Sequence, residues 1–156
     1  MMVAGGSEAC ITPLTIAGFS RMKALSLSPS PSLSSRPFHP HRDGFVLGEG
    51  AGVVILEELS TARHRGANIL CEVVGYGVSG DSFHPTSPCE RGEGARRCMQ
   101  VACQQAGITA NEVAYINAHA TSTPIGDRVE CLAIESFLRE ERERERDSKG
   151  ERERER

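Results

Sequence analysis

Apolar positions along the chain fall into short runs separated by stretches with helical spacing. Nearly continuous apolar runs predict strands at residues 2–4, 45–56, 69–76 and 113–118. Apolar residues that recur every three or four positions predict helices over 93–106 and 127–138. Because strands alternate with helices, we predict a layered α/β fold in which these strands belong to one sheet system.

The ends of several elements are also marked. The run "GFVLGEGAGVVILEEL" is apolar after its glycines, which predicts a strand buried on both faces. The segment "STARHRG" predicts a short helix with Ser60 as its N-cap and Gly66 at its end. Gly107 ends the helix predicted over 93–106, and "CITPLTIAGFSRMKALS" contains a proline-led turn and a short helix.

Charge divides the chain into two regions. The 156 residues carry a net charge of −3, so overall charge does not indicate a nucleic-acid partner. Residues 139–156 contain eight basic and eight acidic residues and no apolar one, so they cannot offset their ordering entropy by burial. We therefore predict one partial domain over 1–138 and a low-complexity, disordered tail over 139–156 that makes no tertiary contact. A helical extension and a charged interaction arm remain alternatives.

Several functions are disfavoured by the sequence. The six cysteines show no zinc-ligand spacing, and we expect reduced thiols in an intracellular protein with no metal. "MMVAGGSEAC" lacks the basic and apolar regions of a secretory signal, and no apolar segment approaches the length of a membrane span. The glycines of "GEGAG" precede or lie within a strand rather than opening a helix, which disfavours a dinucleotide-binding loop.

The segment "YINAHATSTPIGD" carries the strongest chemical signal. His119 follows a predicted strand, and ligand crevices of open α/β sheets lie at the carboxyl ends of strands. Small and hydroxyl-bearing neighbours leave room for a substrate. An imidazole there can donate a hydrogen bond to a developing oxyanion or move protons near neutral pH, which indicates acyl or carbonyl chemistry. A purely structural histidine is the alternative.

These residues resemble a known family. "NAHATSTPIGD" is similar to the first histidine motif of the β-ketoacyl-acyl carrier protein synthases, the condensing enzymes of fatty acid synthesis. "SRPFHPHRDGFVLGEGAGVVILEE", "VVGYGVSGDSFHPTSP" and "GEGARRCM" resemble further blocks of that family, in order and spacing. The resemblance covers residues 2 to about 138. Alanine at position 120, where most bacterial members have glycine, together with "RPFHP" points to the mitochondrial form.

The resemblance implies an incomplete thiolase-like αβαβα fold and a homodimer. It implies that an acyl group moves from acyl carrier protein to a cysteine, after which malonyl-acyl carrier protein loses carbon dioxide and attacks the acyl thioester. No cofactor is expected beyond the phosphopantetheine of acyl carrier protein, and neither nucleic acid nor membrane is an expected partner.

The resemblance also suggests roles for individual residues. His119 matches one of two histidines that donate hydrogen bonds to the enolate oxygen. Thr121, Thr123 and Thr86 match residues of the malonyl and phosphopantetheine channel, and Phe19 matches an acyl-pocket residue. Asp127 and Glu130 match trailing acids that would support the histidine loop.

The chain departs from the family pattern at both ends. The resemblance places the nucleophilic cysteine before residue 1 and the second histidine near "REERERER", and neither is among these 156 residues. We therefore expect a synthase by descent whose isolated 156-residue chain is inactive. The alternatives are a non-catalytic fragment that pairs with a full subunit or binds acyl carrier protein, and a piece of a polyketide-type condensing domain.

Overall fold

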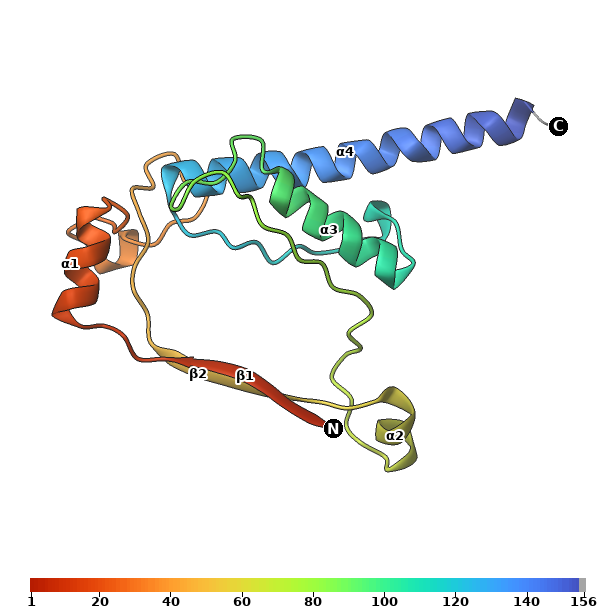
Figure 1. Cartoon of the computed structure of the whole chain (residues 1–156), viewed down its shortest axis with the longest axis horizontal. Coiled ribbons are helices and arrows are strands. Elements are labelled where there is room, and N and C mark those ends of the chain that lie inside the picture. Colours follow the sequence, from red (N-terminus) through yellow and green to blue (C-terminus); the bar gives the residue numbers. More distant parts are fainter. Residues whose placement is uncertain (155–156) are drawn as a thin grey trace. The chain divides into compact units, whose positions relative to one another are not determined.

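The computed structural model describes residues 1–154, with side chains through Arg139, and divides them into two compact units (Figure 1). The first unit comprises Met1–Ser35 and Asp43–Val73, and the second comprises Arg36–Arg42 and the chain from Val74 onward. The first contains β1 (Met2–Glu8), α1 (Pro13–Arg21), η1 (Pro31–Leu33), β2 (Gly50–Leu56) and α2 (Leu59–His64). The second contains α3 (Glu93–Ala106), η2 (Ala110–Glu112) and α4 (Pro124–Arg154).

In the first unit, β1 and β2 form an antiparallel pair in which Met2 lies opposite Leu56 and Glu8 lies opposite Gly50. The two strands approach so closely that a Cβ atom at Gly5 would overlap the carbonyl oxygen of Gly52. Both strands are exposed, with Val3 at 71% and Ile55 at 64% of full exposure. The expectation of a strand buried on both faces is therefore wrong, because in the described part of the chain no layer covers this two-stranded sheet.

The predicted strands over 69–76 and 113–118 are also wrong, and so is the single sheet system of four strands. A strand needs a neighbour with which its backbone N–H and C=O groups pair. The first segment instead runs toward α3: the N–H of Tyr76 donates to the Gln105 side chain, and Gly75 and Gly77 lie against the α3 backbone. The strand predictions at 2–4 and 45–56 are confirmed for β1 and for the 50–56 part of the second run.

Helix ends follow local chemistry. The hydroxyl of Thr12 accepts from the N–H of Thr15 and caps α1, with Pro13 in its first turn. The N-cap of α2 is Glu58 rather than the predicted Ser60, because the longer Glu58 carboxylate reaches the N–H groups of Ser60 and Thr61. The predicted end of α3 at Gly107 is confirmed by its left-handed φ of 69°.

The core of the second unit lies where α3 and η2 pack against α4 (Figure 1). Its buried apolar side chains are Ala110, Val129, Ala133 and Phe137. Gly92, at the start of α3, lies so close to α4 that a Cβ atom would come within 2.8 Å of the Ala133 Cβ. The backbone of α4 stays helical to Arg154, which corresponds to the helical extension considered above. Whether residues 139–156 make tertiary contacts stays a prediction, because the side chains from residue 140 lie outside the described ones.

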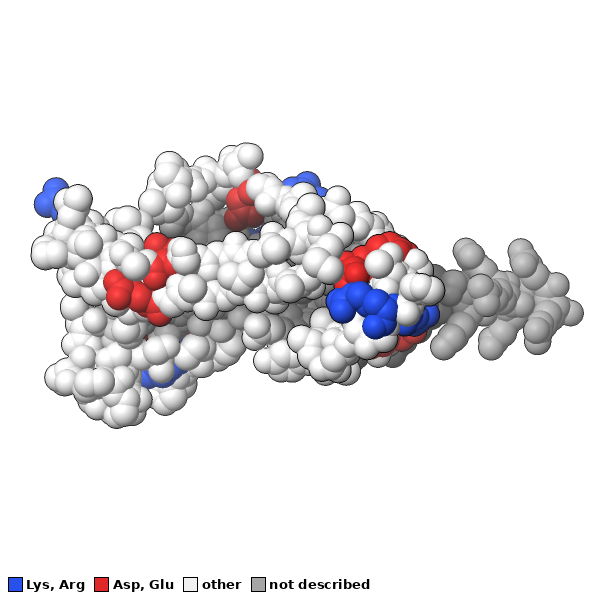
Figure 2. Space-filling model, turned by 90° about the horizontal axis from the view of Figure 1, so that it is seen from below, with Lys and Arg blue, Asp and Glu red and all other residues white. Residues whose placement is uncertain are grey.

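On the face in Figure 2, Lys and Arg lie in small groups apart or beside Asp and Glu, and most side chains are neither. Among the described helices, none offers an apolar stretch long enough to cross a bilayer. The six cysteines are free, and the described residues hold no cluster of three or more His, Cys, Asp or Glu side chains suited to a metal ion.

Candidate active site around His119

His119 lies in an exposed position in the loop before α4. Its backbone N–H donates to Glu130 Oε1 at 2.6 Å, and the N–H of Ala120 donates to Glu130 Oε2 at 2.8 Å. Glu130 lies on α4, so one carboxylate holds two consecutive loop amides against the helix. These bonds use the His119 backbone and leave its imidazole at the surface, unlike the satisfied core position of a structural histidine.

The loop after His119 adopts a backbone that most side chains disfavour. Ala120 has φ 45° and Ser122 has φ 67°, both in the left-handed region. The Ser122 side chain is fully buried, and its Oγ accepts a hydrogen bond of 3.0 Å from the N–H of Arg36. Strained conformations of this kind persist where surrounding contacts determine them, and they are frequent at functional sites.

The hydroxyls of the loop bond to each other and to the start of α4. Thr121 Oγ1 lies 3.0 Å from Thr123 Oγ1, and Thr123 Oγ1 also accepts from the N–H of Gly126 at 3.1 Å. The N–H of Asp127 donates to the carbonyl oxygen of Thr123 at 3.2 Å. The structure thus brings His119, Thr121, Thr123, Asp127 and Glu130 together in one loop and the first two turns of one helix.

Asp127 is 1% exposed, and its Oδ2 accepts from the N–H of Phe38 at 2.8 Å. The same oxygen lies 3.3 Å from Arg42 Nε, which supplies the opposite charge that a buried carboxylate requires. A negative side chain in the first turn of α4 also complements the helix dipole. The Glu130 carboxylate thus bonds the start of the loop that carries His119, and the backbone N–H of Asp127 bonds its end at Thr123.

Two other predicted site residues lie elsewhere. Thr86 is exposed in the second unit, where its N–H and hydroxyl contact His84 Nδ1 at 3.2 and 3.4 Å. Phe19 lies on α1 in the first unit and makes an edge-to-face contact with Phe45, with ring centroids 5.2 Å apart. The described contacts therefore join neither residue to His119, and both substrate-contact roles stay predictions.

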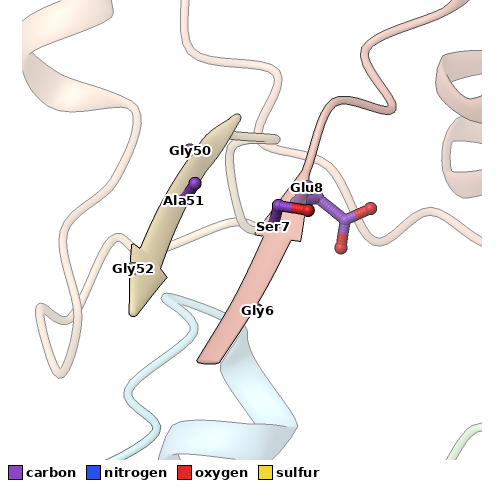
Figure 3. Close-up of a pocket in the computed structure, with 6 residues that line it drawn as sticks. All are labelled: Gly6, Ser7, Glu8, Gly50, Ala51 and Gly52. Carbon is purple, nitrogen blue, oxygen red and sulfur yellow. The ribbon is translucent and has the colours of Figure 1, made fainter. Parts of the chain in front are cut away.

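A shallow, open depression lies between β1 and β2 in the first unit (Figure 3). It is lined by Gly6, Ser7, Glu8, Gly50, Ala51 and Gly52. The Glu8 carboxylate points away from β2 in this view, so the depression is formed mainly by backbone and small side chains. It contains none of the predicted site residues.

Solved structures that share this arrangement are ketosynthases. The chain is similar to a type II polyketide ketosynthase solved in complex with its acyl carrier protein, with TM-score 0.84 and 39% identity over 88% of this chain and 34% of that one. A beta-ketoacyl synthase from Burkholderia phymatum has TM-score 0.82 and 41% identity over 88% of this chain and 33% of that one. The chain therefore has part of the ketosynthase fold, which is α/β and thiolase-like.

Sequence comparison identifies the family. The N-terminal domain of beta-ketoacyl synthases matches residues 1–62, and their C-terminal domain matches residues 70–148, so the chain belongs to the beta-ketoacyl synthase family. It is 55% identical over 140 residues to 3-oxoacyl-acyl-carrier-protein synthase 2 of Rhizobium meliloti, covering 88% of this chain and 33% of that protein. It is 54% identical over 142 residues to the mitochondrial synthase of Arabidopsis thaliana, covering 90% of this chain and 31% of that protein. The chain thus spans about a third of the length of these relatives.

Sequence reasoning did not identify Arg42 as part of the site. Its guanidinium contacts Thr123 at the end of the loop and Pro124 and Asp127 at the start of α4, more than 80 positions later in the chain. Neither hydrophobic periodicity nor local spacing reports a contact over such a separation. The only signal was that "RPFHPHRDGF" and "NAHATSTPIGD" resemble blocks of the same family.

Proposed function

We propose that this chain is the central part of a 3-oxoacyl-acyl carrier protein synthase, in which His119 donates a hydrogen bond to the enolate formed from malonyl-acyl carrier protein. The observation that carries this proposal is the exposed imidazole on a loop whose backbone is held by Glu130. The relatives named above, synthases by name with 54–55% identity, support the substrate class.

The chemistry follows from the position of the imidazole. When the malonyl group loses carbon dioxide, the electron pair of the broken C–C bond forms an enolate, and negative charge develops on the thioester oxygen. A ring N–H of His119 stabilises that oxygen, and a donor of this kind contributes about 10²–10³ in rate. The enolate carbon then attacks an acyl thioester carbonyl, and the thiolate leaves. Thr121 and Thr123 lie beside the histidine and can bond the thioester arm.

Acyl carrier protein is the proposed partner, and a second synthase subunit is the proposed assembly partner. The polyketide ketosynthase named above was solved with its acyl carrier protein, which supports the first of these. A mitochondrial location is proposed from the resemblance and from the Arabidopsis relative, whereas the Rhizobium relative is bacterial.

The binding step can be tested without turnover. The isotope-labelled chain is titrated with malonyl-acyl carrier protein while backbone amide resonances are recorded, with acyl carrier protein lacking the malonyl group as the reference. We expect malonyl-dependent shifts at residues 119–123 and at Thr86. Shifts confined to other segments, or the same shifts without the malonyl group, would contradict the proposed role of this loop.

A matched pair of variants sharpens the test. His119→Ala removes the proposed donor and should weaken the malonyl-dependent shifts. His64→Ala removes another exposed imidazole, on α2 in the first unit, and should leave the shifts unchanged. If both substitutions had equal effects on the shifts, the malonyl-dependent binding would not depend on the His119 imidazole.

A further inference from the structure

The segment Arg36–Arg42 belongs structurally to the second unit, although the chain on both sides of it belongs to the first. Two of its backbone N–H groups bond to buried side chains near His119. Arg36 N donates to Ser122 Oγ at 3.0 Å, and Phe38 N donates to Asp127 Oδ2 at 2.8 Å. Phe38 has a left-handed φ of 62°, a conformation that an aromatic residue holds only where its surroundings determine it.

Arg42, at the end of this segment, contacts the loop and the start of α4 through its guanidinium. Its Nη2 donates to the carbonyl oxygen of Pro124 at 2.7 Å, and its Nε donates to that of Thr123 at 3.0 Å. The single Nε hydrogen also faces Asp127 Oδ2 at the longer distance of 3.3 Å. The Arg42 side chain is 16% exposed; its bond to Thr123 is partly buried, whereas its bond to Pro124 lies at an exposed position.

The loop is consequently held at both ends. Glu130 holds the amides of His119 and Ala120, while Arg42 holds the carbonyls of Thr123 and Pro124. Only Thr121 and Ser122 lie between the two anchors, and the Ser122 side chain is itself buried against the Arg36 amide. A short loop with both ends fixed has little conformational freedom, so we expect a change at the Arg42 anchor to alter the position of the histidine.

We propose that Arg42 is a positioning residue for His119: its planar guanidinium fixes the Thr123–Pro124 end of the histidine loop on α4. The placement of His119 is thereby coupled to docking of the Arg36–Arg42 segment. That this coupling affects the condensation reaction rests on the proposed function. The coupling itself depends only on the geometry of this chain.

Lysine and arginine should differ at this position. A guanidinium presents several N–H groups in a fixed plane and can bond two carbonyls and a carboxylate together, whereas an ammonium group is a compact charge on a flexible stem. Arg42→Lys keeps the charge beside Asp127 but loses the planar pair of bonds to Thr123 and Pro124. Arg42→Met removes both the charge and the hydrogen bonds.

The test follows the ring resonances of His119 and backbone amide exchange in the 156-residue chain. In Arg42→Met we expect the His119 resonances to shift and the amides of Gly126 and Asp127 to exchange about tenfold faster or more, while α3 amides keep their rates. Arg42→Lys should move the same signals less. Arg63→Met is the control, because Arg63 is 67% exposed and pairs with Glu72 in the first unit.

Unchanged His119 resonances in both Arg42 variants would overturn the proposal, as would an equal rise in exchange throughout α3, which indicates only a global loss of stability. Arg42→Met can unfold the chain, because it leaves Asp127 without its counter-charge. In that case the His119 resonances of Arg42→Lys alone test the proposal. Failure of the wild-type chain to bind malonyl-acyl carrier protein would contradict the proposed function, and a His119 shift in Arg42→Lys would still establish the positioning role.

Discussion

The backbone N–H of Ala120 donates a hydrogen bond of 2.8 Å to the carboxylate of Glu130 while Ala120 holds a φ of 45°. A left-handed backbone costs a residue with a Cβ atom about 1–2 kcal/mol relative to glycine. The bond to Glu130 therefore helps to maintain a strained conformation directly beside His119, and the strain is a measurable property of this loop.

Ala120→Gly should raise the free energy of unfolding by about 1 kcal/mol, because glycine adopts this φ without the Cβ penalty. Chemical denaturation of both proteins measures the difference. Ala114→Gly is the matched control, because Ala114 is exposed and is not among the residues with positive φ. It should leave stability unchanged or lower it slightly. A destabilised Ala120→Gly variant would show that the left-handed conformation is not strained.

The Glu58 cap of α2 predicts that the stability of this helix, in the first unit, depends on pH. Hydrogen bonds from the Ser60 and Thr61 hydroxyls, and then from their backbone N–H groups, lower the pKa of Glu58 from 4.5 to about 2. Because the folded pKa lies below the unfolded one, the cap stabilises α2 fully above pH 4.5, and this contribution is lost as the pH falls toward 2. Carboxyl carbon NMR of Glu58 measures the titration.

Ser60→Ala provides the internal comparison for this titration, because it removes the largest cause of the lowered pKa and leaves the Ser60 backbone N–H in place. The Glu58 pKa should move toward its ordinary value in this variant. A wild-type Glu58 that titrates like a free glutamate would contradict the cap geometry.

The contact between Gly77 and α3 leaves no room for a side chain. A Cβ atom at Gly77 would overlap the backbone carbonyl of Cys98, whereas a Cβ atom at Gly80 would meet no atom within 4 Å. Gly77→Ala should therefore lower the free energy of unfolding by about 1–3 kcal/mol, the usual cost of overpacking. Thermal or chemical denaturation should show a much smaller effect for Gly80→Ala, and equal effects would mean that this segment does not pack against α3.

Phe137 is the largest fully buried side chain of the second unit, at 1% exposure. Phe137→Ala should lower the free energy of unfolding by about 3–5 kcal/mol, because it removes apolar burial and leaves a cavity under α4. Leu132→Ala is the control on the same helix, since Leu132 is 40% exposed. Similar losses of unfolding free energy in the two variants would contradict a core centred on Phe137.

A polypeptide of these 156 residues should show no condensing activity, because the resemblance matches none of its six cysteines to the nucleophile. Acyl transfer to the protein requires a reactive thiolate, and decarboxylation then has only the His119 donor. Incubation with acyl- and malonyl-acyl carrier protein, followed by mass spectrometry for 3-oxoacyl product and for acylated cysteine, measures both steps. Turnover that disappears on substitution of one cysteine would identify a nucleophile that the resemblance did not.

The sequence predicted the helices well, because their signals are local. Gly107 marked the end of α3, and the apolar spacing after Asp127 marked the 127–138 part of α4, which begins at Pro124 and continues to Arg154. The strands over 69–76 and 113–118 were wrong, because an apolar run records a tendency to be buried but not the presence of a neighbouring strand. The same limit explains β2, whose apolar residues are exposed in this structure.

The candidate site was predictable where its residues are consecutive. His119 and the acids on α4 fall within one motif, so a single stretch of sequence brought them together. The support from Arg42 could not be predicted from the pattern, because a contact with Thr123 and Pro124 depends on the path of a chain segment more than 80 residues away.

The positions of β1 and β2 in the sequence also set how long β1 lacks its partner strand while the chain is being synthesised. β1 leaves the ribosome about 50 residues before β2 is complete, and translation adds about 5–20 residues per second. β1 is therefore synthesised several seconds before its partner strand. This interval is longer than the time in which a β-hairpin forms once both strands are present. During that interval the nascent chain presents β1 with unpaired backbone N–H and C=O groups and with the apolar side chains of Met2 and Val3 uncovered, and unpaired strand edges of this kind favour aggregation.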